Sequence, residues 1–285
     1  MRWKGQRQSS HVEDRRGRGG RIAKGGAKMS IWTILIVIVI SVVTGKNPLS
    51  LMQMVGGSQQ GASSQSSTSA PRISAAEQEL AAFAKTVQAS TEDAWTAEFK
   101  RRGSQYQAPG MVLFDGKVQS ACGVNSESTG PFYCPGDHKL YLSLSFFNQL
   151  RKMGAPGDFA QAYVIAHEVG HHIQNILGTE KKMREMQRRD PRNKNQYLVL
   201  LELQADCYAG VWAALSQQQK NWLEDGDVEE GLRAAASIGD DTLQRNAGRR
   251  VNVESFTHGS SEQRVKWLRK GMSTGDLSQC DTFAR

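Results

Sequence analysis

The feature that most constrains the fold is a histidine pair inside one apolar segment. The sequence FAQAYVIAHEVGHHIQNIL contains the pattern H-E-x-x-H, formed by His167, Glu168 and His171. Residues four apart lie one above the other on an α-helix, so a helix brings the two imidazoles to one point. The pattern therefore predicts a helix from Gly157 to Gly178 with both histidines on one face and Glu168 beside them.

Polar side chains in this apolar setting need a partner, because unpaired polar groups are costly to bury. His167 and His171 at this spacing are typical zinc ligands, and Glu168 is typical of the general base beside them. The alternative is a helix with incidental histidines. His172 is rotated about 100° from the pair, so we interpret it as a structural or surface histidine.

A catalytic zinc ion usually takes three protein ligands and leaves a fourth position open. The segment LELQAD places Glu202 and Asp206 four residues apart, on one face of an otherwise apolar helix. We predict that Glu202 is the third ligand and that Asp206 accepts the N–H of a ligand histidine. Two alternatives stay open, namely Asp206 on zinc with Glu202 behind it, and an ion pair without metal.

A zinc ion beside a general base is a typical arrangement for hydrolysis of an amide bond. Such a reaction also needs a group that stabilises the oxyanion of the tetrahedral intermediate. His258 lies in a predicted loop just before a helix, so it is our candidate for this role, and Arg264 is a weaker one. The alternatives are a helix-capping loop for His258 and a surface salt bridge for Arg264. His138 precedes a predicted strand and is interpreted as structural.

From Ser74 onward, short strands come before helices, which predicts an α+β domain. Residues 111–120 are typical of two strands turned at Asp115-Gly116, and residues 139–145 of a strand that could accept a peptide along its edge. Residues 181–195 are highly charged and predict a solvated helical excursion. Helices are predicted from Ser74, where Glu77 completes a capping box, and at 157–178, 195–215, 228–238 and 261–270.

The four cysteines are even in number and follow a long apolar stretch, as expected in an oxidising compartment. We favour a disulfide between Cys122 and Cys134, which flank a turn-rich segment, and by remainder one between Cys207 and Cys280. A structural zinc site is disfavoured because C-x-x-C pairs are absent.

Positive charge is concentrated at the start of the chain. Residues 1–28 hold nine Lys or Arg and two Asp or Glu, which gives +7 of the formal net charge of +8. The remainder is nearly neutral, so a nucleic-acid-binding face is not expected. The apolar residues 29–45 predict a single-pass anchor in the inner membrane, although a cleaved signal or a buried core helix is also possible. The positive-inside rule puts the N-terminus in the cytoplasm and the main domain on the periplasmic side.

These boundaries define four segments. Residues 1–28 are expected to be a basic disordered cytoplasmic segment, residues 29–45 the transmembrane anchor, and residues 46–73 a Ser/Gln/Gly-rich linker. Residues 74–285 are expected to form the main domain. Nothing in the sequence indicates an oligomeric state.

Several separate motifs in one order resemble the bacterial neutral zinc metallopeptidases. They are RWKG at 2–5, VEDRRG at 12–17, FYCPGD at 132–137, HEVGHH at 167–172, ELQADCYAG at 202–210 and THGSSEQR at 257–264. The resemblance implies a membrane-attached, zincin-like fold with an active-site helix, a small antiparallel sheet and a second ligand helix. By analogy with membrane-associated gluzincins, it favours Glu202 over Asp206 as the zinc ligand.

These observations together predict a membrane-anchored zinc metalloendopeptidase acting on a peptide or protein substrate. Glu168 would activate a water at the zinc ion and pass its proton to the leaving amine. The alternatives are a non-catalytic scaffold or adaptor of the cell envelope and a zinc amidase acting on cell-wall crosslinks. Glu168 argues against a scaffold, which needs the ligands but no base.

Overall fold

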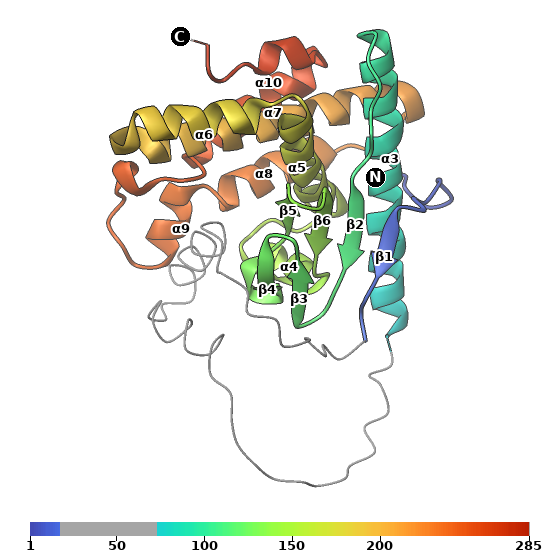
Figure 1. The fold of residues 1–285 in the computed structure, drawn as a ribbon. Coiled ribbons are helices and arrows are strands. Elements are labelled where there is room, and N and C mark those ends of the chain that lie inside the picture. Colours follow the sequence, from blue (N-terminus) through green and yellow to red (C-terminus); the bar gives the residue numbers. More distant parts are fainter. Residues whose placement is uncertain (18–72, 285) are drawn as a thin grey trace, which may run out of the picture.

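The computed structural model describes residues 1–17 and 73–284, which form an α+β domain with a small sheet against a group of helices (Figure 1). The expected α+β class is confirmed. The largest fully buried side chains include Trp95, Trp212 and Trp222, so the main core lies between the long helices.

Two long helices carry the candidate site residues. The H-E-x-x-H segment forms α5 (Asp158–Ile176), and the two carboxylates lie on α7 (Lys194–Lys220). α3 (Ala75–Arg101) begins where predicted, because Ser74 and Glu77 form the capping box. The other helices of the described part are α4 (Ser145–Lys152), α6 (Thr179–Arg189), α8 (Asp227–Ser237), α9 (Asp240–Asn246) and α10 (Ser261–Thr274).

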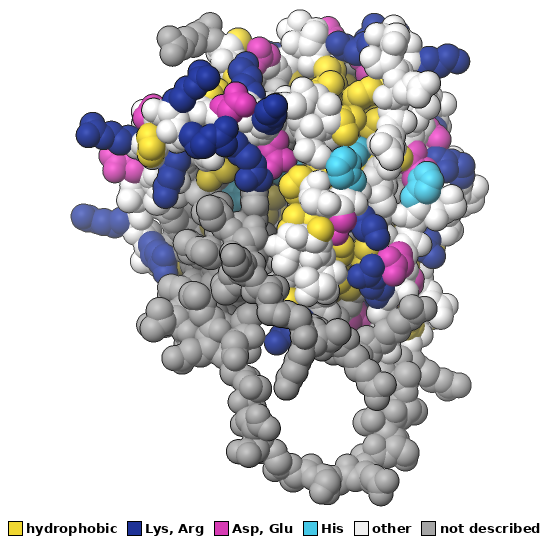
Figure 2. All heavy atoms as spheres, viewed as in Figure 1, with side chains coloured by type: hydrophobic (Ala, Val, Ile, Leu, Met, Phe, Trp, Pro, Cys, Tyr) yellow, Lys and Arg dark blue, Asp and Glu magenta, His cyan; other side chains and the backbone are white. Residues whose placement is uncertain are grey.

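α4 and α9 were not predicted from the sequence. α6 is the predicted charged helix, and Figure 2 shows Lys and Arg side chains gathered over it. Among the described residues, one helical stretch, Pro191–Lys220, is long and apolar enough to cross a membrane. However, 78 % of its most apolar window is buried inside the domain, as in a core helix.

The main sheet is mixed, whereas a small antiparallel sheet was expected. Its strand order is β1-β2-β6-β5, and only the β5–β6 pair is antiparallel. The strand predicted to accept a peptide along its edge is β6, which is an inner strand, so β5 is the edge strand on that side. The strands are β1 (Val12–Asp14), β2 (Gly110–Leu113), β5 (Phe132–Cys134) and β6 (Lys139–Leu142).

The strands on either side of Asp115-Gly116 do not pair with each other. β2 joins the main sheet, while β3 (Lys117–Ser120) forms a separate antiparallel hairpin with β4 (Gly123–Ser126). The turn is present because Gly116 adopts a positive φ of 66°, which glycine tolerates. The prediction of two turned strands was therefore right about the strands and wrong about their partners.

Residues 1–17 are folded onto the domain, although we expected residues 1–28 to be disordered. β1 pairs in parallel with β2, and the rings of Trp3 and Phe83 pack edge to face with centroids 5.3 Å apart. The domain expected to begin at Ser74 therefore also includes residues 1–17. Residues 18–28, the apolar stretch 29–45 and all but the last residue of the 46–73 linker lie outside the described residues.

α7 and α10 pack so closely that their backbones touch. A Cβ atom on Gly210 would lie 2.2 Å from the Leu268 carbonyl oxygen, and one on Gly271 would lie 2.0 Å from the Cys207 carbonyl oxygen. Only glycine fits at these two points. Close packing here fixes α10, which carries Arg264, against the helix that carries Glu202 and Asp206.

Both predicted disulfides are present. Cys122 is bonded to Cys134, which ties the β3–β4 hairpin to β5, and Cys207 is bonded to Cys280, which ties α7 to the C-terminal segment. There are no free cysteines in the described part of the chain.

Candidate metal centre

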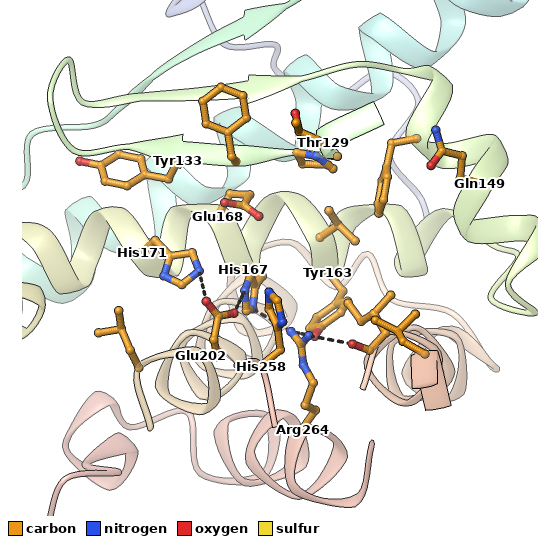
Figure 3. A pocket seen from close by; sticks show the side chains of 18 of the residues that line it. Thr129, Tyr133, Gln149, Tyr163, His167, Glu168, His171, Glu202, His258 and Arg264 are labelled. Carbon is orange, nitrogen blue, oxygen red and sulfur yellow. Dashed lines mark hydrogen bonds and ion pairs between the residues drawn. The ribbon is translucent and has the colours of Figure 1, made fainter. Parts of the chain in front are cut away.

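The ligand atoms of His167, His171 and Glu202 converge at the junction of α5 and α7. One donor atom from each residue lies within 4.8 Å of the other two. The Glu202 carboxylate is 3.2 Å from His167 Nε2 and 3.5 Å from His171 Nε2 (Figure 3). Two imidazoles and one carboxylate are a typical donor set for a catalytic zinc ion, so the residues present fit this metal.

The outer nitrogens of both imidazoles are hydrogen-bonded to acceptors. His167 Nδ1 donates to Asp206 Oδ1 at 2.9 Å, and His171 Nδ1 donates to Gln174 Oε1 at 2.9 Å. The side-chain amide nitrogen of Gln174 donates to the Leu201 carbonyl at 2.6 Å, so the side-chain oxygen of Gln174 faces His171. Both histidines therefore carry the proton on Nδ1, which leaves the Nε2 lone pairs for a metal.

Asp206 lies behind His167 and is held by two further groups. Arg264 forms a bidentate ion pair with it, with both nitrogen–oxygen distances 2.9 Å, and the Tyr163 hydroxyl donates to its Oδ1 at 2.5 Å. Asp206 is fully buried. Its oxygens are thus directed at Arg264, Tyr163 and His167 Nδ1, and this geometry favours Glu202 as the metal-facing acid.

Arg264 is committed to this cluster as well. Its side chain is 3 % exposed, and its Nη2 also donates to the Tyr163 hydroxyl at 3.1 Å. The guanidinium therefore serves as the counter-charge of Asp206, which leaves it poorly placed to act as the oxyanion helper that we considered from the sequence.

The electrostatics of the cluster favour positive charge at its centre. Burial lowers the pKa of His167, but the charge and hydrogen bond of Asp206 raise it more strongly, to about 9. Burial raises the pKa of Glu202, but His171 and His167 hold it well below its ordinary value. Two buried carboxylates that remain ionised attract either protons or a cation to the imidazoles.

Glu168 projects from α5 into a cavity of about 380 Å³ that also contains the three ligand atoms (Figure 3). Among the described residues, its carboxylate has no hydrogen-bond or ion-pair partner. A carboxylate that faces a cavity beside the ligands is free to accept a proton from a water molecule. The site therefore combines a ligand set with an available base.

The cavity has one wall made of β5 and the turn before it, and another made of α5 and α7. Apolar side chains from α4, α5 and the α8–α9 region complete it. They are Phe146, Met153, Val164, Ile238 and Leu243.

His258 lines the same cavity and is held by the loop before α10. Asp240 accepts the backbone N–H groups of Thr257, His258 and Gly259, at 2.7, 2.7 and 3.1 Å. Its other oxygen lies 3.3 Å from His258 Nδ1. One carboxylate thus fixes both the loop and the ring, and with Nδ1 held by Asp240 the Nε2 atom remains free to act in the cavity.

His172 on α5 and His138, just before β6, do not line the cavity. His172 is buried, with Nε2 donating to the Gln107 carbonyl at 2.7 Å and Nδ1 3.0 Å from the Tyr133 hydroxyl. It thereby links α5 to β5. His138 precedes β6 in a left-handed turn with φ 55° and is exposed.

Sequence reasoning missed Tyr163 and Gln174, which orient the site from the same helix. Tyr163 lies one turn before His167, and Gln174 lies three residues after His171. Their helical spacing was a usable signal, because residues three or four apart share a face. No spacing pattern in the sequence indicated that side chains of α4 line the cavity, because their position there depends on tertiary packing alone.

The geometry agrees with a comparison against known families. A profile described as "Putative neutral zinc metallopeptidase" matches residues 1–283. The chain belongs to this family. Membership in the neutral zinc metallopeptidase family implies a zinc cofactor, consistent with the donor set of His167, His171 and Glu202.

Curated relatives of the chain match over long segments. "Uncharacterized protein YpfJ" of Escherichia coli strain K12 is 44 % identical over 290 residues, covering 100 % of this chain and 99 % of that protein. "Uncharacterized protein Mb2605" of Mycobacterium bovis is 43 % identical over 190 residues, covering 63 % of this chain and 64 % of that protein. No solved structure matches the chain.

Proposed function

We propose that this protein is a zinc metalloendopeptidase that hydrolyses bonds within peptide or protein substrates. The observation that carries the proposal is the convergence of three ligand atoms within 4.8 Å beside the carboxylate of Glu168, which has no hydrogen-bond or ion-pair partner among the described residues. A scaffold needs the ligands for its fold but has no use for a free carboxylate directed into the same cavity.

The roles of the residues follow from their positions. A zinc ion held by His167, His171 and Glu202 would supply Lewis-acid chemistry that polarises a carbonyl group and acidifies water. Glu168 takes the proton from the attacking water and later delivers it to the leaving amine. Asp240 and Glu202 raise the pKa of His258 although burial lowers it; in the protonated form, with Nδ1 directed at Asp240, His258 donates from Nε2 to the negative charge that develops on the carbonyl oxygen of the substrate.

Substrate binding is assigned to the cavity walls. β5 is the edge strand that contacts α5 and lines the cavity, so an extended peptide can add to it by main-chain hydrogen bonds. The apolar wall, which includes Phe146 and Ile238, accepts an apolar side chain of the substrate. The proposed substrate is therefore an unfolded or extended segment with an apolar residue near the cleaved bond.

Zinc content and proteolysis of the purified full-length chain test this proposal together. Glu168→Gln should retain one zinc ion per chain and lose at least about 100-fold in the rate of cleavage of an unfolded protein. Glu202→Ala should lose both zinc and activity. Glu229→Gln, at an exposed position of α8, is the matched control and should change neither.

The alternatives give different results in the same assay. A full complement of zinc with no cleavage by the unaltered chain would support the scaffold, and release of peptidoglycan fragments without cleavage of protein would support the amidase. Absence of zinc from the unaltered chain would refute the site.

A further inference from the structure

The first described segment, residues 1–17, completes the main sheet of the domain. Val12, Glu13 and Asp14 of β1 lie opposite Met111, Val112 and Leu113 of β2. The Met111 N–H donates to the His11 carbonyl at 2.8 Å, and the Arg15 N–H donates to the Leu113 carbonyl at 2.8 Å. β1 therefore covers a strand edge that would otherwise be unpaired.

Side chains of the same segment are part of the main core. Met1 is 9 % exposed, and Trp3 packs against the core residue Phe83 on α3. The backbone N–H of Arg2 donates to the Trp222 carbonyl at 2.7 Å, beyond the end of α7. The segment thus contacts both α3 and the chain after α7.

Two basic residues of this segment, Lys4 and Arg7, are paired with acids of α3. Lys4 Nζ lies 2.7 Å from Glu79 Oε1, and Arg7 Nη2 lies 3.0 Å from Glu92 Oε2 and 2.6 Å from Asp93 Oδ1. From the sequence, these charges contributed to an expected cytoplasmic N-terminus. In the structure they instead bind a partner within the domain.

The segment leaves the domain where α3 begins. Arg16 Nη1 donates to the carbonyl oxygen of Glu77, in the first turn of α3, at 2.8 Å. The last residues described before the gap, up to Gly17, and the first described after it, from Ile73, therefore lie at one end of the domain (Figure 1). The apolar stretch 29–44 lies between them in the sequence.

We propose that residues 1–17 and the domain that follows residue 72 lie on the same side of the membrane, so that the apolar stretch between them in the sequence does not serve as a single-pass anchor. A bilayer between residues 17 and 73 would separate β1 from β2 and Lys4 from Glu79. The expected single-pass topology is incompatible with these contacts.

The length of the apolar stretch agrees with this arrangement. Sixteen residues from Met29 to Thr44 would extend about 24 Å as a helix, against a hydrocarbon thickness of roughly 30 Å. They are too few to cross twice, which a return to the same side would require. The twelve peptide units between Gly17 and Met29 reach at most about 40 Å, so the end of the domain where α3 begins would lie close to any lipid that the stretch entered.

Cross-linking of the full-length chain in native membranes tests this proposal directly and does not depend on catalysis. Lys4 and Glu79 are both exposed, and a carbodiimide joins such a pair in an amide bond only when the two side chains touch. Mass spectrometry is expected to find the peptide pair linked through Lys4 and Glu79. Glu79→Gln is the matched control, because it removes the carboxylate and should abolish that linked pair.

A second measurement determines the membrane side independently. Single cysteines at Gln8 and Lys266, both exposed, are labelled with a membrane-impermeant maleimide in right-side-out and inverted vesicles. Both positions are expected to react in the same vesicle preparation. Reaction of the two cysteines in opposite preparations, with no Lys4–Glu79 amide, would overturn the proposal.

Discussion

The imidazole Nδ1 of His167 lies 2.9 Å from Oδ1 of Asp206, although the two residues belong to different helices. This contact sets the tautomer of His167 and couples the histidine to the buried Arg264. The orientation of a proposed metal ligand thus depends on a residue that does not face the metal position.

Replacement of Asp206 should therefore weaken metal binding without removing a ligand. Asp206→Asn is expected to lower zinc affinity 10–100-fold, measured by competition with a chelator. Asp240→Asn changes another buried carboxylate, one that does not touch a proposed zinc ligand, so its zinc affinity should stay within about twofold. Equal affinities for the two variants would contradict the role assigned to Asp206.

Removal of the metal should leave the chain folded. Arg264 already compensates Asp206, and the histidines already bind Glu202, so no buried carboxylate of the cluster is left unpaired. Zinc at 1,000 times its dissociation constant would stabilise the chain by about 4 kcal/mol. With a chelator, Tm is expected to fall by roughly 10 °C while the circular dichroism at 25 °C is unchanged. Unfolding at 25 °C on chelation would show that the metal is required for the fold.

The ion pair of Asp240 and His258 should make stability depend on pH. Burial raises the pKa of Asp240, but His258 and backbone N–H groups lower it more strongly, so the net pKa lies below the ordinary value. The stabilisation that the Asp240 carboxylate contributes therefore exists above about pH 4 and is lost on acidification. Burial lowers the pKa of His258, but Asp240 and Glu202 raise it more strongly, so the net pKa lies above the ordinary value. The stabilisation that the charged His258 ring contributes is therefore complete below about pH 6.5 and is lost as pH rises.

The pair is therefore strongest between about pH 4 and 6.5. In urea unfolding of chelator-treated chains, Asp240→Asn should cost more free energy at pH 5.5 than at pH 9. Asp241→Asn is the control, because its partners Ser261 and Arg245 do not titrate in this range. A cost for Asp240→Asn that is the same at both pH values would exclude the charge on His258 as a stabilising term.

The contact of α7 with α10 should not tolerate even one added methyl group. Gly210→Ala and Gly271→Ala are each expected to lower the free energy of unfolding by about 1–3 kcal/mol or more, because the Cβ would meet backbone atoms. Gly110→Ala is the matched control, since its Cβ would approach only the flexible Lys139 side chain, at 3.3 Å. Thermal unfolding compares the three variants, and a similar small shift in all three would argue against a close backbone contact.

The helical parts of the site were predictable because the relevant signals are local. The spacing of His167 to His171 and of Glu202 to Asp206 places each pair on one helical face, whatever the rest of the fold does. The sheet was less predictable, since the pairing of β2 with β1 and β6 joins segments far apart in the sequence.

The role of residues 1–17 was misjudged for a related reason. Their high charge and low hydrophobicity are typical of disorder when no partner is known. The partners are acids such as Glu79 and Glu92, on a helix that begins more than fifty residues later. Composition describes the segment alone, whereas its order depends on a surface formed elsewhere in the chain.

The pairing of β1 with β2 also has a consequence for synthesis. Val12 can pair with Met111 only after Met111 has been synthesised, roughly a hundred residues later. At ordinary rates of translation this takes about 5–20 s. The apolar stretch 29–44 leaves the ribosome within that interval, so any encounter of this stretch with lipid would come before the sheet can close. Under the proposed same-side arrangement, any chain that carried residues 1–17 across a bilayer would leave the edge of β2 uncovered, and an uncovered edge invites aggregation. Closure of the sheet would then distinguish a chain with the proposed topology from one without it.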